Sequence, residues 1–263
     1  MAIVTLTTDF GLRDPWVGSL KGALLSIATN LTLVDLTHDV PRHNVAAASY
    51  VVAAASRHFP AGTIHLVVVD PGVGGARRPL ACAAGGAMFV GPDNGVFDRV
   101  LGRDPDARCV EITDPRVMRR VPSDSPTFQG RDVFAPVAAC LALGTRLDDL
   151  GPAVDDPIRL SAPDVRRNGS TWIGEVVWVD RFGNLISNIE VPSGVSAANV
   201  RVGASDLPVV ACYSDGPTGE AAALINSDRL IEVFVNRGDA SETLKAGTGA
   251  PVFAAIVGKP GQT

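Results

Sequence analysis

An acid and an arginine flank a glycine-rich turn in the first half of the chain. Residues 64–69 form an apolar, β-branched run that predicts a strand buried on both faces. Asp70 follows at once, and Pro71 and three glycines separate it from Arg77. Glycines let a ligand approach the backbone, and open α/β sheets bind ligands at the carboxyl ends of strands. This predicts a site, although Asp-Pro-Gly is equally typical of an ordinary turn.

Polar turns follow apolar runs at several other places. Asp9 ends a first predicted strand at residues 2–8, and residues 91–95, Gly-Pro-Asp-Asn-Gly, end another. Residues 125–132 precede an Ala-rich predicted helix, 133–143, in which the free N–H groups of the helix start favour anions or lone pairs. The turn at 91–95, taken alone, is at least as typical of a plain Asn-Gly turn as of a binding site.

A later turn, residues 180–184, brings an acid, an aromatic ring and an amide together. The side chain of Asn184 can both donate to and accept from an adenine edge, and the ring of Phe182 can stack on the base. Taken alone this turn also has the simpler interpretation of a bend. Neither familiar phosphate loop is present, because Arg77 stands where the dinucleotide fingerprint needs a glycine and no Walker A pattern occurs.

The composition limits the class of protein. The net charge of −5 and pI of 5.3 argue against nucleic acid and anionic membranes as main partners. The start of the chain has no basic region typical of a signal peptide, and the longest apolar run, 45–55, is too short to span a bilayer. Four cysteines without a Cys-x-x-Cys spacing predict neither zinc nor a disulfide framework. We therefore expect a cytoplasmic protein without a metal.

The order of predicted elements indicates two domains. Strands alternate with helices in residues 1–160, which predicts an α/β domain with a parallel sheet and flanking helices. In this domain Asp14 is expected to cap a helix that has Pro15 in its first position, and Asn44 to cap the next. A proline-rich segment, 151–168, is expected to be a linker. Short alternating runs in residues 170–263 then predict a smaller all-β, barrel-like domain. Its predicted strands include residues 171–179, 207–213, 221–225 and 230–235, and a helix is expected only near 240–246.

Five of these motifs, in order, resemble one family along nearly the whole chain: Thr8-Asp9-Phe10-Gly11, Val69-Asp70-Pro71-Gly72-Val73-Gly74 with Arg77, Gly91-Pro92-Asp93-Asn94-Gly95, Ser125-x-Thr127-Phe128-x-Gly130-Arg131-Asp132, and Asp180-x-Phe182-Gly183-Asn184. The sequence is similar to the S-adenosyl-L-methionine hydroxide adenosyltransferases, relatives of the fluorinase and chlorinase enzymes. The resemblance implies an α/β domain, a β-barrel and a homotrimer with sites between neighbouring subunits. It further implies attack of water or hydroxide on C5′ of S-adenosyl-L-methionine, which is a substrate, so no cofactor is expected.

The resemblance also implies roles for individual residues. Asp70 and Arg77 match two of the three groups that hold the water, and Gln129 stands where the family has a histidine. Glutamine can orient a water but cannot take its proton. The implied substrate contacts are Asp9 with the ribose hydroxyls, Asp14 and Asp180 with the methionine amino group, Ser227 with the methionine carboxylate, Asn184 and Phe182 with adenine, backbone near Asn236 to Ala240 with adenine, His43 beside the ribose, and Phe128 and Gly130 beside the nucleophile.

Three alternatives remain open at this point. The glutamine at position 129 fits a protein that binds S-adenosyl-L-methionine or adenosine without catalysis. A halide-using adenosyltransferase fits Gly130, although the carboxylate of Asp70 would repel a bound anion. A metal-dependent phosphohydrolase could use the acids Asp9, Asp14, Asp70 and Asp93. Two details are equally open: whether Arg77 or Arg78 points into the site, and how Asp228-Arg229, where relatives usually place a glycine, affects the contact with the methionine carboxylate.

Overall fold

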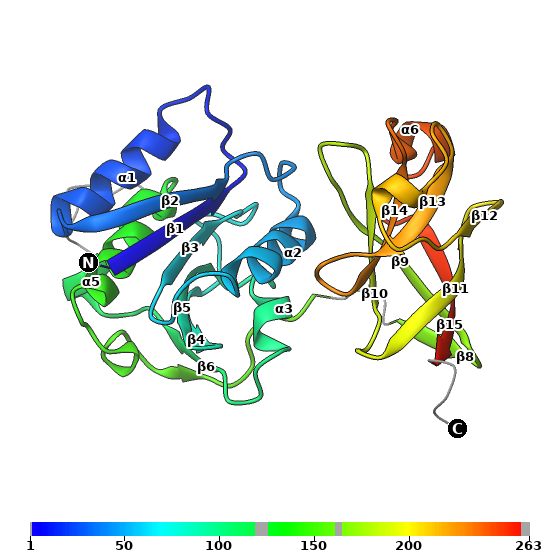
Figure 1. The fold of residues 1–263 in the computed structure, drawn as a ribbon. Helices are drawn as coiled ribbons and strands as arrows, with labels where there is room; N and C mark the ends of the chain where they lie inside the picture. The colour runs from blue at the N-terminus through cyan, green and yellow to red at the C-terminus, as the bar shows by residue number, and fades with distance from the viewer. Residues whose placement is uncertain (1, 119–125, 161–164, 259–263) are drawn as a thin grey trace. The chain divides into compact units, whose positions relative to one another are not determined.

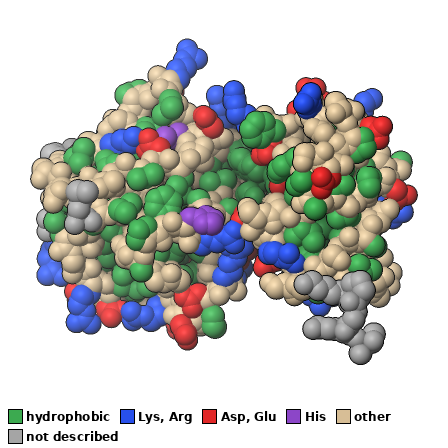
Figure 2. Space-filling model, in the orientation of Figure 1, with side chains coloured by type: hydrophobic (Ala, Val, Ile, Leu, Met, Phe, Trp, Pro, Cys, Tyr) green, Lys and Arg blue, Asp and Glu red, His purple; other side chains and the backbone are tan. Residues whose placement is uncertain are grey.

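The computed structural model describes residues 2–118, 126–160 and 165–258 (Figure 1). The chain divides into two compact units, Met1–Ser161 and Ala162–Thr263. Ser125 of the fourth motif lies outside the described residues. No helix in the described ranges is long and apolar enough to cross a membrane. On the face shown in Figure 2, acidic and basic side chains are interspersed within each unit.

A mixed sheet of seven strands forms the centre of the first unit, in the order β2-β1-β3-β5-β4-β6-β7. β1 pairs in parallel with β2 and β3, and β3 with β5, whereas β4, β6 and β7 are antiparallel to their neighbours. The predicted parallel sheet is therefore correct only for its first part. The strands are β1 (Ala2–Thr8), β2 (Leu31–Thr37), β3 (Ile64–Val68), β4 (Pro79–Ala84), β5 (Ala87–Pro92), β6 (Arg108–Glu111) and β7 (Ala153–Val154).

The antiparallel part starts at a tight hairpin between β4 and β5. Ala84 pairs with Ala87, so Gly85 and Gly86 form a two-residue turn, and both have positive φ, 56° and 76°. Such turns need left-handed backbone at both central positions, which glycine adopts at little cost. The Gly-Gly pair therefore turns the chain back against β5, where a helical crossover would have given another parallel strand.

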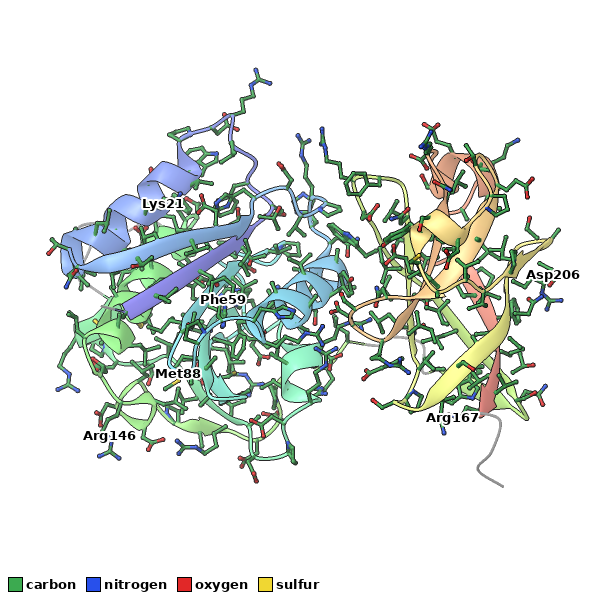
Figure 3. The ribbon with its side chains drawn as sticks, in the orientation of Figure 1. Lys21, Phe59, Met88, Arg146, Arg167 and Asp206 are labelled. Carbon is green, nitrogen blue, oxygen red and sulfur yellow. The ribbon has the colours of Figure 1, made fainter. Side chains whose placement is uncertain are left out.

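Helices cover both faces of this sheet. Figure 1 shows α1 and α5 on one side of the strands and α2 and α3 on the other, which explains why all five residues of β3 are buried. In Figure 3, Lys21 lies on α1, and its ammonium group pairs with Asp35 of β2 at 2.6 Å. The helices and helical turns are α1 (Trp16–Ile27), α2 (Val45–Ser56), α3 (Asp98–Leu101), α4 (Pro115–Met118), the π-helical η1 (Gly130–Phe134), α5 (Ala135–Ala142) and the 3-10 turn η2 (Leu147–Asp149).

The two predicted helix caps have opposite outcomes. Asn44 caps α2, and its side-chain oxygen accepts a hydrogen bond of 2.9 Å from the Ala47 N–H. The predicted cap at Asp14 is wrong, because Pro15 occupies the N-cap position and α1 begins at Trp16 without a side-chain cap. Asp14 stands one residue too early to receive the N–H groups of the first turn. Its exposed carboxylate is thus not used by the helix.

A histidine lies in the core of the first unit. His65 of β3 is fully buried, and its Nδ1 lies 2.7 Å from the Thr5 hydroxyl. Its ring stacks on Phe89 at 4.9 Å and meets the edge of Phe59 at 5.8 Å (Phe59 is labelled in Figure 3). Burial among these rings disfavours the charged imidazolium and lowers the pKa of His65 to about 4.

A nearly closed antiparallel sheet forms the second unit, in the order β12-β11-β15-β9-β10-β14-β13, with β8 paired to β9. A bridge between Val209 and Ala223, and a 2.8 Å hydrogen bond from Val210 N–H to Ala223 C=O, bring the two edges together. This agrees with the predicted barrel. Its strands are β8 (Arg166–Asn168), β9 (Thr171–Val179), β10 (Leu185–Glu190), β11 (Val195–Val202), β12 (Ser205–Pro208), β13 (Ala221–Ile225), β14 (Leu230–Val235) and β15 (Pro251–Gly258).

Two expectations for this half of the chain need correction. The predicted strand 207–213 ends at Pro208, because proline has no N–H for the ladder, and Tyr213 lies in the 3-10 turn η3 (Tyr213–Asp215). The segment 151–168, expected as a linker, supplies β7 to the first sheet and β8 to the second. The predicted helix near 240–246 is α6 (Ala240–Leu244).

Candidate functional site

An acid–arginine pair lies just beyond the carboxyl end of β3. The Arg77 Nε lies 3.0 Å from each carboxylate oxygen of Asp70, and its Nη2 also donates to that carboxylate. Both side chains are nearly buried, with 4% of Asp70 and 9% of Arg77 exposed. This geometry needs the glycine turn, because Gly74 has φ of 76° and packs against Pro126. The turn folds Arg77 back over the end of its own strand.

Gln129 completes this cluster, so the three expected catalytic residues lie together. The Arg77 Nη2 donates to the Gln129 Oε1, which fixes the amide with its oxygen toward the guanidinium. The Gln129 NH2 group then faces away from Arg77 and can donate to a ligand. The guanidinium also lies over the Phe134 ring, with its carbon 5.3 Å from the ring centre. Contact with this aromatic ring keeps the arginine in one orientation.

The neighbouring arginine has a different task. Arg78 donates to Asp93 at 2.7 Å and to Asp156 at 2.8 Å, and these two acids raise its pKa. Asp93 also accepts the Ile158 N–H at 2.8 Å and is 2% exposed. Arg77 is therefore the arginine of the site, and Arg78 joins β4 to the segment near 156–158. The carboxylate of Asp93 is paired with the guanidinium of Arg78 and is not part of the Asp70 cluster.

The third motif also positions Asp70. Asn94 donates through Nδ2 to the Val69 carbonyl at 2.9 Å, while its oxygen accepts the Val96 N–H at 3.1 Å. Val69 directly precedes Asp70, so this bond holds the chain where β3 ends. The turn at 91–95 is thus a support for the site, and its sequence alone did not distinguish that role from a plain bend.

Asp9 and His43 lie together at the carboxyl end of β1. The Asp9 Oδ2 accepts the backbone N–H of His43 at 2.9 Å, and His43 has a positive φ of 64°. Among the described residues, no donor bonds to the other carboxylate oxygen of Asp9, which leaves that oxygen available to a ligand. The exposed Asp14 lies in the loop that follows Asp9.

Aromatic rings gather beside Gln129. Phe128 meets Phe10 at 5.8 Å and Trp16 at 5.6 Å between ring centres, both edge to face. Gly130 is buried, and a Cβ there would lie 3.2 Å from a Val68 methyl group, closer than most real contacts. Glycine therefore lets the start of η1 approach β3. Phe128 and Gly130, both expected near the nucleophile, directly precede and follow Gln129 in the sequence. Phe128 packs against two aromatic rings, and Gly130 packs against β3.

In the second unit, Asp180 organises the turn that contains Asn184. Its Oδ1 accepts the N–H groups of Phe182 at 2.8 Å and Asn184 at 2.9 Å, and its Oδ2 accepts the Asn184 Nδ2 at 3.0 Å. Gly183 has φ of 80°, and a Cβ there would lie 2.1 Å from the Asp239 carboxylate. Only glycine fits between this turn and the start of α6.

A buried carboxylate that sequence reasoning missed lies behind Asn184. Glu232 is 4% exposed, and its Oε1 accepts the Asn184 Nδ2 at 3.1 Å and the Tyr213 hydroxyl at 2.6 Å. Its Oε2 accepts the Asn226 Nδ2 at 3.1 Å. The signal was present in the sequence, because Glu232 interrupts the otherwise apolar run Leu230–Val235. A charge in the middle of a buried strand needs partners, which predicts a polar network.

These residues border a pocket of about 480 Å³. Phe182 stands at its rim with 74% of its surface exposed. Such a volume suits a small molecule, and the exposed ring offers a face for stacking. The pocket is lined by Asp180, Phe182, Asn184, Tyr213, Phe234, Val235, Asn236, Arg237 and Gly238.

The remaining predicted residues lie on two turns of the second unit. Ser227 is exposed in the turn that follows β13, where Arg229 has φ of 65° and donates to the carbonyls of residues 191, 192 and 195. These hydrogen bonds hold Arg229 in a left-handed backbone conformation that glycine adopts more readily. The Asn236 Nδ2 donates to the Gly216 carbonyl at 2.6 Å, and Ala240 is fully buried at the start of α6.

Within residues 2–118, 126–160 and 165–258, no three His, Cys, Asp or Glu side chains are grouped as ligands. The fold and these contacts define a two-domain protein with an acid–arginine site in an α/β unit and an amide-lined pocket in a β-barrel unit.

The chain belongs to the family of S-adenosyl-L-methionine hydroxide adenosyltransferases. Residues 4–151 match the N-terminal domain of SAM hydroxide adenosyltransferases, and residues 174–253 match their C-terminal domain. The resemblance seen in the five motifs is therefore confirmed.

Similar proteins cover nearly the whole chain. An (R)-S-adenosyl-L-methionine hydrolase of Thermus thermophilus is 41% identical over 258 residues, 96% of this chain and 99% of its own. Another, of Salinispora arenicola, is 38% identical and covers 92% of this chain and 93% of its own. A fluorinase of Actinoplanes sp. is 27% identical and covers 89% and 91%. An uncharacterised conserved protein of Thermotoga maritima has a solved structure with a TM-score of 0.88, 35% identity, and coverage of 96% and 99%.

Proposed function

We propose that this protein hydrolyses S-adenosyl-L-methionine to adenosine and L-methionine. The observation that carries the proposal is the cluster of Asp70, Arg77 and Gln129 at the end of β3, in a chain that is similar to (R)-S-adenosyl-L-methionine hydrolases. The names of those relatives further suggest the (R) configuration at sulfur. The free cysteines, three of them buried, fit a reducing compartment, so we place the reaction in the cytoplasm.

The reaction needs a well-positioned water molecule more than it needs a general acid. The sulfonium sulfur leaves as a neutral thioether, so the leaving group needs no proton. The nucleophile is the difficulty, because free water has a pKa of about 15.7. In the proposed reaction the water oxygen attacks C5′, the C5′–S bond breaks, and Asp70 accepts the proton that the water loses. Arg77 supplies positive charge beside the hydroxide-like oxygen.

Gln129 has a donor role in this scheme. Its oxygen is already used by Arg77, so its NH2 group is what it can offer the water. A donor holds the water oxygen in line with C5′ while leaving the proton to Asp70. Placement in a nearly dry site supplies much of the acceleration, since both acid and arginine are largely buried.

We infer the substrate contacts from the remaining groups. Asp9 binds the ribose hydroxyls, with His43 beside the ribose, and Phe128 and Gly130 lie near the nucleophile. In the second unit, Asn184 and Phe182 bind adenine, supported by backbone near Asn236 to Ala240. Asp180 and Asp14 bind the methionine amino group, and Ser227 binds its carboxylate. From the resemblance to the family, we further propose a homotrimer with the sites between neighbouring subunits.

The test is product analysis by chromatography. The purified protein is incubated with S-adenosyl-L-methionine, with and without excess chloride and with and without a chelator. A blank without enzyme runs in parallel, because the substrate decays slowly unaided. Adenosine and methionine above the blank, unaffected by chloride or chelator, are the expected result.

Other outcomes would reject the proposal in distinct ways. A chlorinated nucleoside would assign the chain to the halide-using branch of the family. Loss of activity with chelator would favour metal-dependent chemistry. Bound substrate or adenosine without turnover would make the chain a binding protein. Light scattering of the same sample tests the trimer separately, and a monomer with full activity would refute the shared site.

A further inference from the structure

The hydrogen bonds of Asn184 decide which edge of a base it can read; this inference rests on the proposed adenosine site. Both N–H groups of its amide are occupied, one by Asp180 Oδ2 at 3.0 Å and one by Glu232 Oε1 at 3.1 Å. The opposite amide orientation would place a carbonyl oxygen against two carboxylates, which is repulsive. The two acids therefore fix the orientation of the amide.

The carbonyl oxygen of Asn184 is the part left for a ligand. No donor from the described residues bonds to this oxygen, although Asn184 lines the 480 Å³ pocket. Asparagine in solution can donate or accept at a purine edge, but this one is restricted to accepting. A purine with an amino group at C6 presents a donor there, whereas a 6-oxo purine presents another acceptor.

Glu232 is itself held firmly, which makes the restriction rigid. The Tyr213 hydroxyl donates to the same oxygen that binds Asn184, at 2.6 Å, and the Asn226 amide donates to the other at 3.1 Å. The Tyr213 ring packs edge to face on Phe234 at 4.9 Å. A carboxylate with three neutral donors and 4% exposure cannot rotate to release Asn184 without leaving a buried donor unpaired.

We propose that Glu232 is a positioning residue that makes Asn184 an obligate acceptor, so that the pocket selects 6-aminopurine nucleosides and rejects 6-oxopurine nucleosides. Selectivity of this kind is large, because a site built around fixed hydrogen-bonding groups penalises a ligand that leaves them unpaired or opposed. Asn184 contacts the base, and Glu232 acts through it.

Calorimetric binding to the whole wild-type protein tests the inference without any variant. Three nucleosides differ at the C6 position: adenosine has an amino group, purine riboside has hydrogen, and inosine has an oxo group together with a hydrogen on N1. We expect adenosine to bind roughly tenfold more tightly than purine riboside, because one hydrogen bond is lost. Inosine should bind more weakly than purine riboside, because two acceptors then oppose each other. Inosine binding at least as tightly as purine riboside would overturn the proposal.

The variant Glu232→Gln tests the role of the carboxylate. An amide at position 232 can pair with Asn184 in either orientation, so the preference for adenosine over inosine should fall roughly tenfold or more. Glu220→Gln is the matched control, because it makes the same change at an exposed carboxylate of the second unit that does not line the pocket. It should keep the wild-type preference. Equal loss of preference in both variants, or none in Glu232→Gln, would contradict a positioning role.

The outcomes also separate this inference from the proposed function. Binding needs no turnover, so a protein that hydrolyses S-adenosyl-L-methionine but binds the three nucleosides equally would refute only the inference. A protein that prefers adenosine in the expected order but gives no products would refute only the hydrolysis. Thermal unfolding of each variant checks that the fold is retained.

Discussion

Two buried carboxylates, one in each unit, are held in opposite ways. Asp70 is paired with the charged guanidinium of Arg77, whereas the groups that donate to Glu232 among the described residues are neutral, two amides and a phenol. Each is 4% exposed. The charged partner gives Asp70 a local field that suits a reaction in which charge develops. The neutral donors give Glu232 fixed geometry, which suits recognition.

The comparison predicts that the same isosteric change has different effects at the two acids. Asp70→Asn should lower turnover of S-adenosyl-L-methionine by about 1,000-fold, because the proton acceptor is lost. Adenosine binding should change little. Product formation and calorimetric binding measure the two effects. A variant that keeps its turnover, or loses adenosine binding as completely as its turnover, would remove the assigned role from Asp70.

The two units should also respond differently to acid, because all four histidines of the chain lie in the first. The folded pKa of His65 is about 4, below its ordinary 6.5. Protonation of His65 therefore favours the unfolded chain. The free energy of unfolding that comes from keeping this imidazole neutral is fully present above pH 6.5 and is lost as the pH falls toward 4. This contribution of His65 to the free energy of unfolding is about 3 kcal/mol in total, and it changes with pH by up to about 1.4 kcal/mol per pH unit.

Chemical denaturation between pH 4 and pH 7.5, with a probe in the first unit, measures that slope. His65→Gln should flatten it, since glutamine stays neutral and can still bond to Thr5. Other acids titrate in both proteins and therefore cancel in the difference. Equal slopes in the wild type and His65→Gln would show that burial of the imidazole does not govern the acid response.

A third prediction concerns the turn that carries Asn184. Gly183→Ala should destabilise the second unit by about 2 kcal/mol or more, because alanine must adopt a left-handed backbone and its Cβ meets the Asp239 carboxylate. Adenosine binding should weaken with it. Gly169→Ala is the control: φ there is 59°, yet no atom lies within 4 Å of the added Cβ. It should cost only about 1 kcal/mol. Equal unfolding free energies for the two variants would exclude the predicted clash.

The smallest expected effect is at Gln129. Gln129→His should raise turnover several-fold without tightening substrate binding, because imidazole can take the proton that an amide cannot. Gln129→Glu is the contrasting variant, since it keeps an oxygen for Arg77 but replaces the donor NH2 group with negative charge. It should lower turnover. Steady-state kinetics separate kcat from KM, and unchanged turnover in both variants would make position 129 dispensable.

Local patterns were good predictors of the elements. The alternating runs at 171–179, 221–225 and 230–235 are strands with those bounds, because side-chain period and β-branching act within each strand. Prediction was poorer where one residue changed the outcome. The Gly85-Gly86 turn made the first sheet mixed, and Pro208 ended a strand that apolar residues alone would have extended.

The sequence by itself determined the family, the two kinds of unit and the association of an acid with an arginine, since these depend on residue types at fixed spacing. It could not decide whether Arg77 or Arg78 belongs to the site, and it could not show that the turn at 91–95 supports the end of β3 through Asn94. Those outcomes depend on contacts between distant segments, such as Arg77 with Gln129 and Arg78 with Asp156. The same holds for Glu232. In the sequence it is a single acid in an apolar strand, and only the fold places three donors around it. A buried carboxylate takes its function from its partners, and only the tertiary structure brings them together.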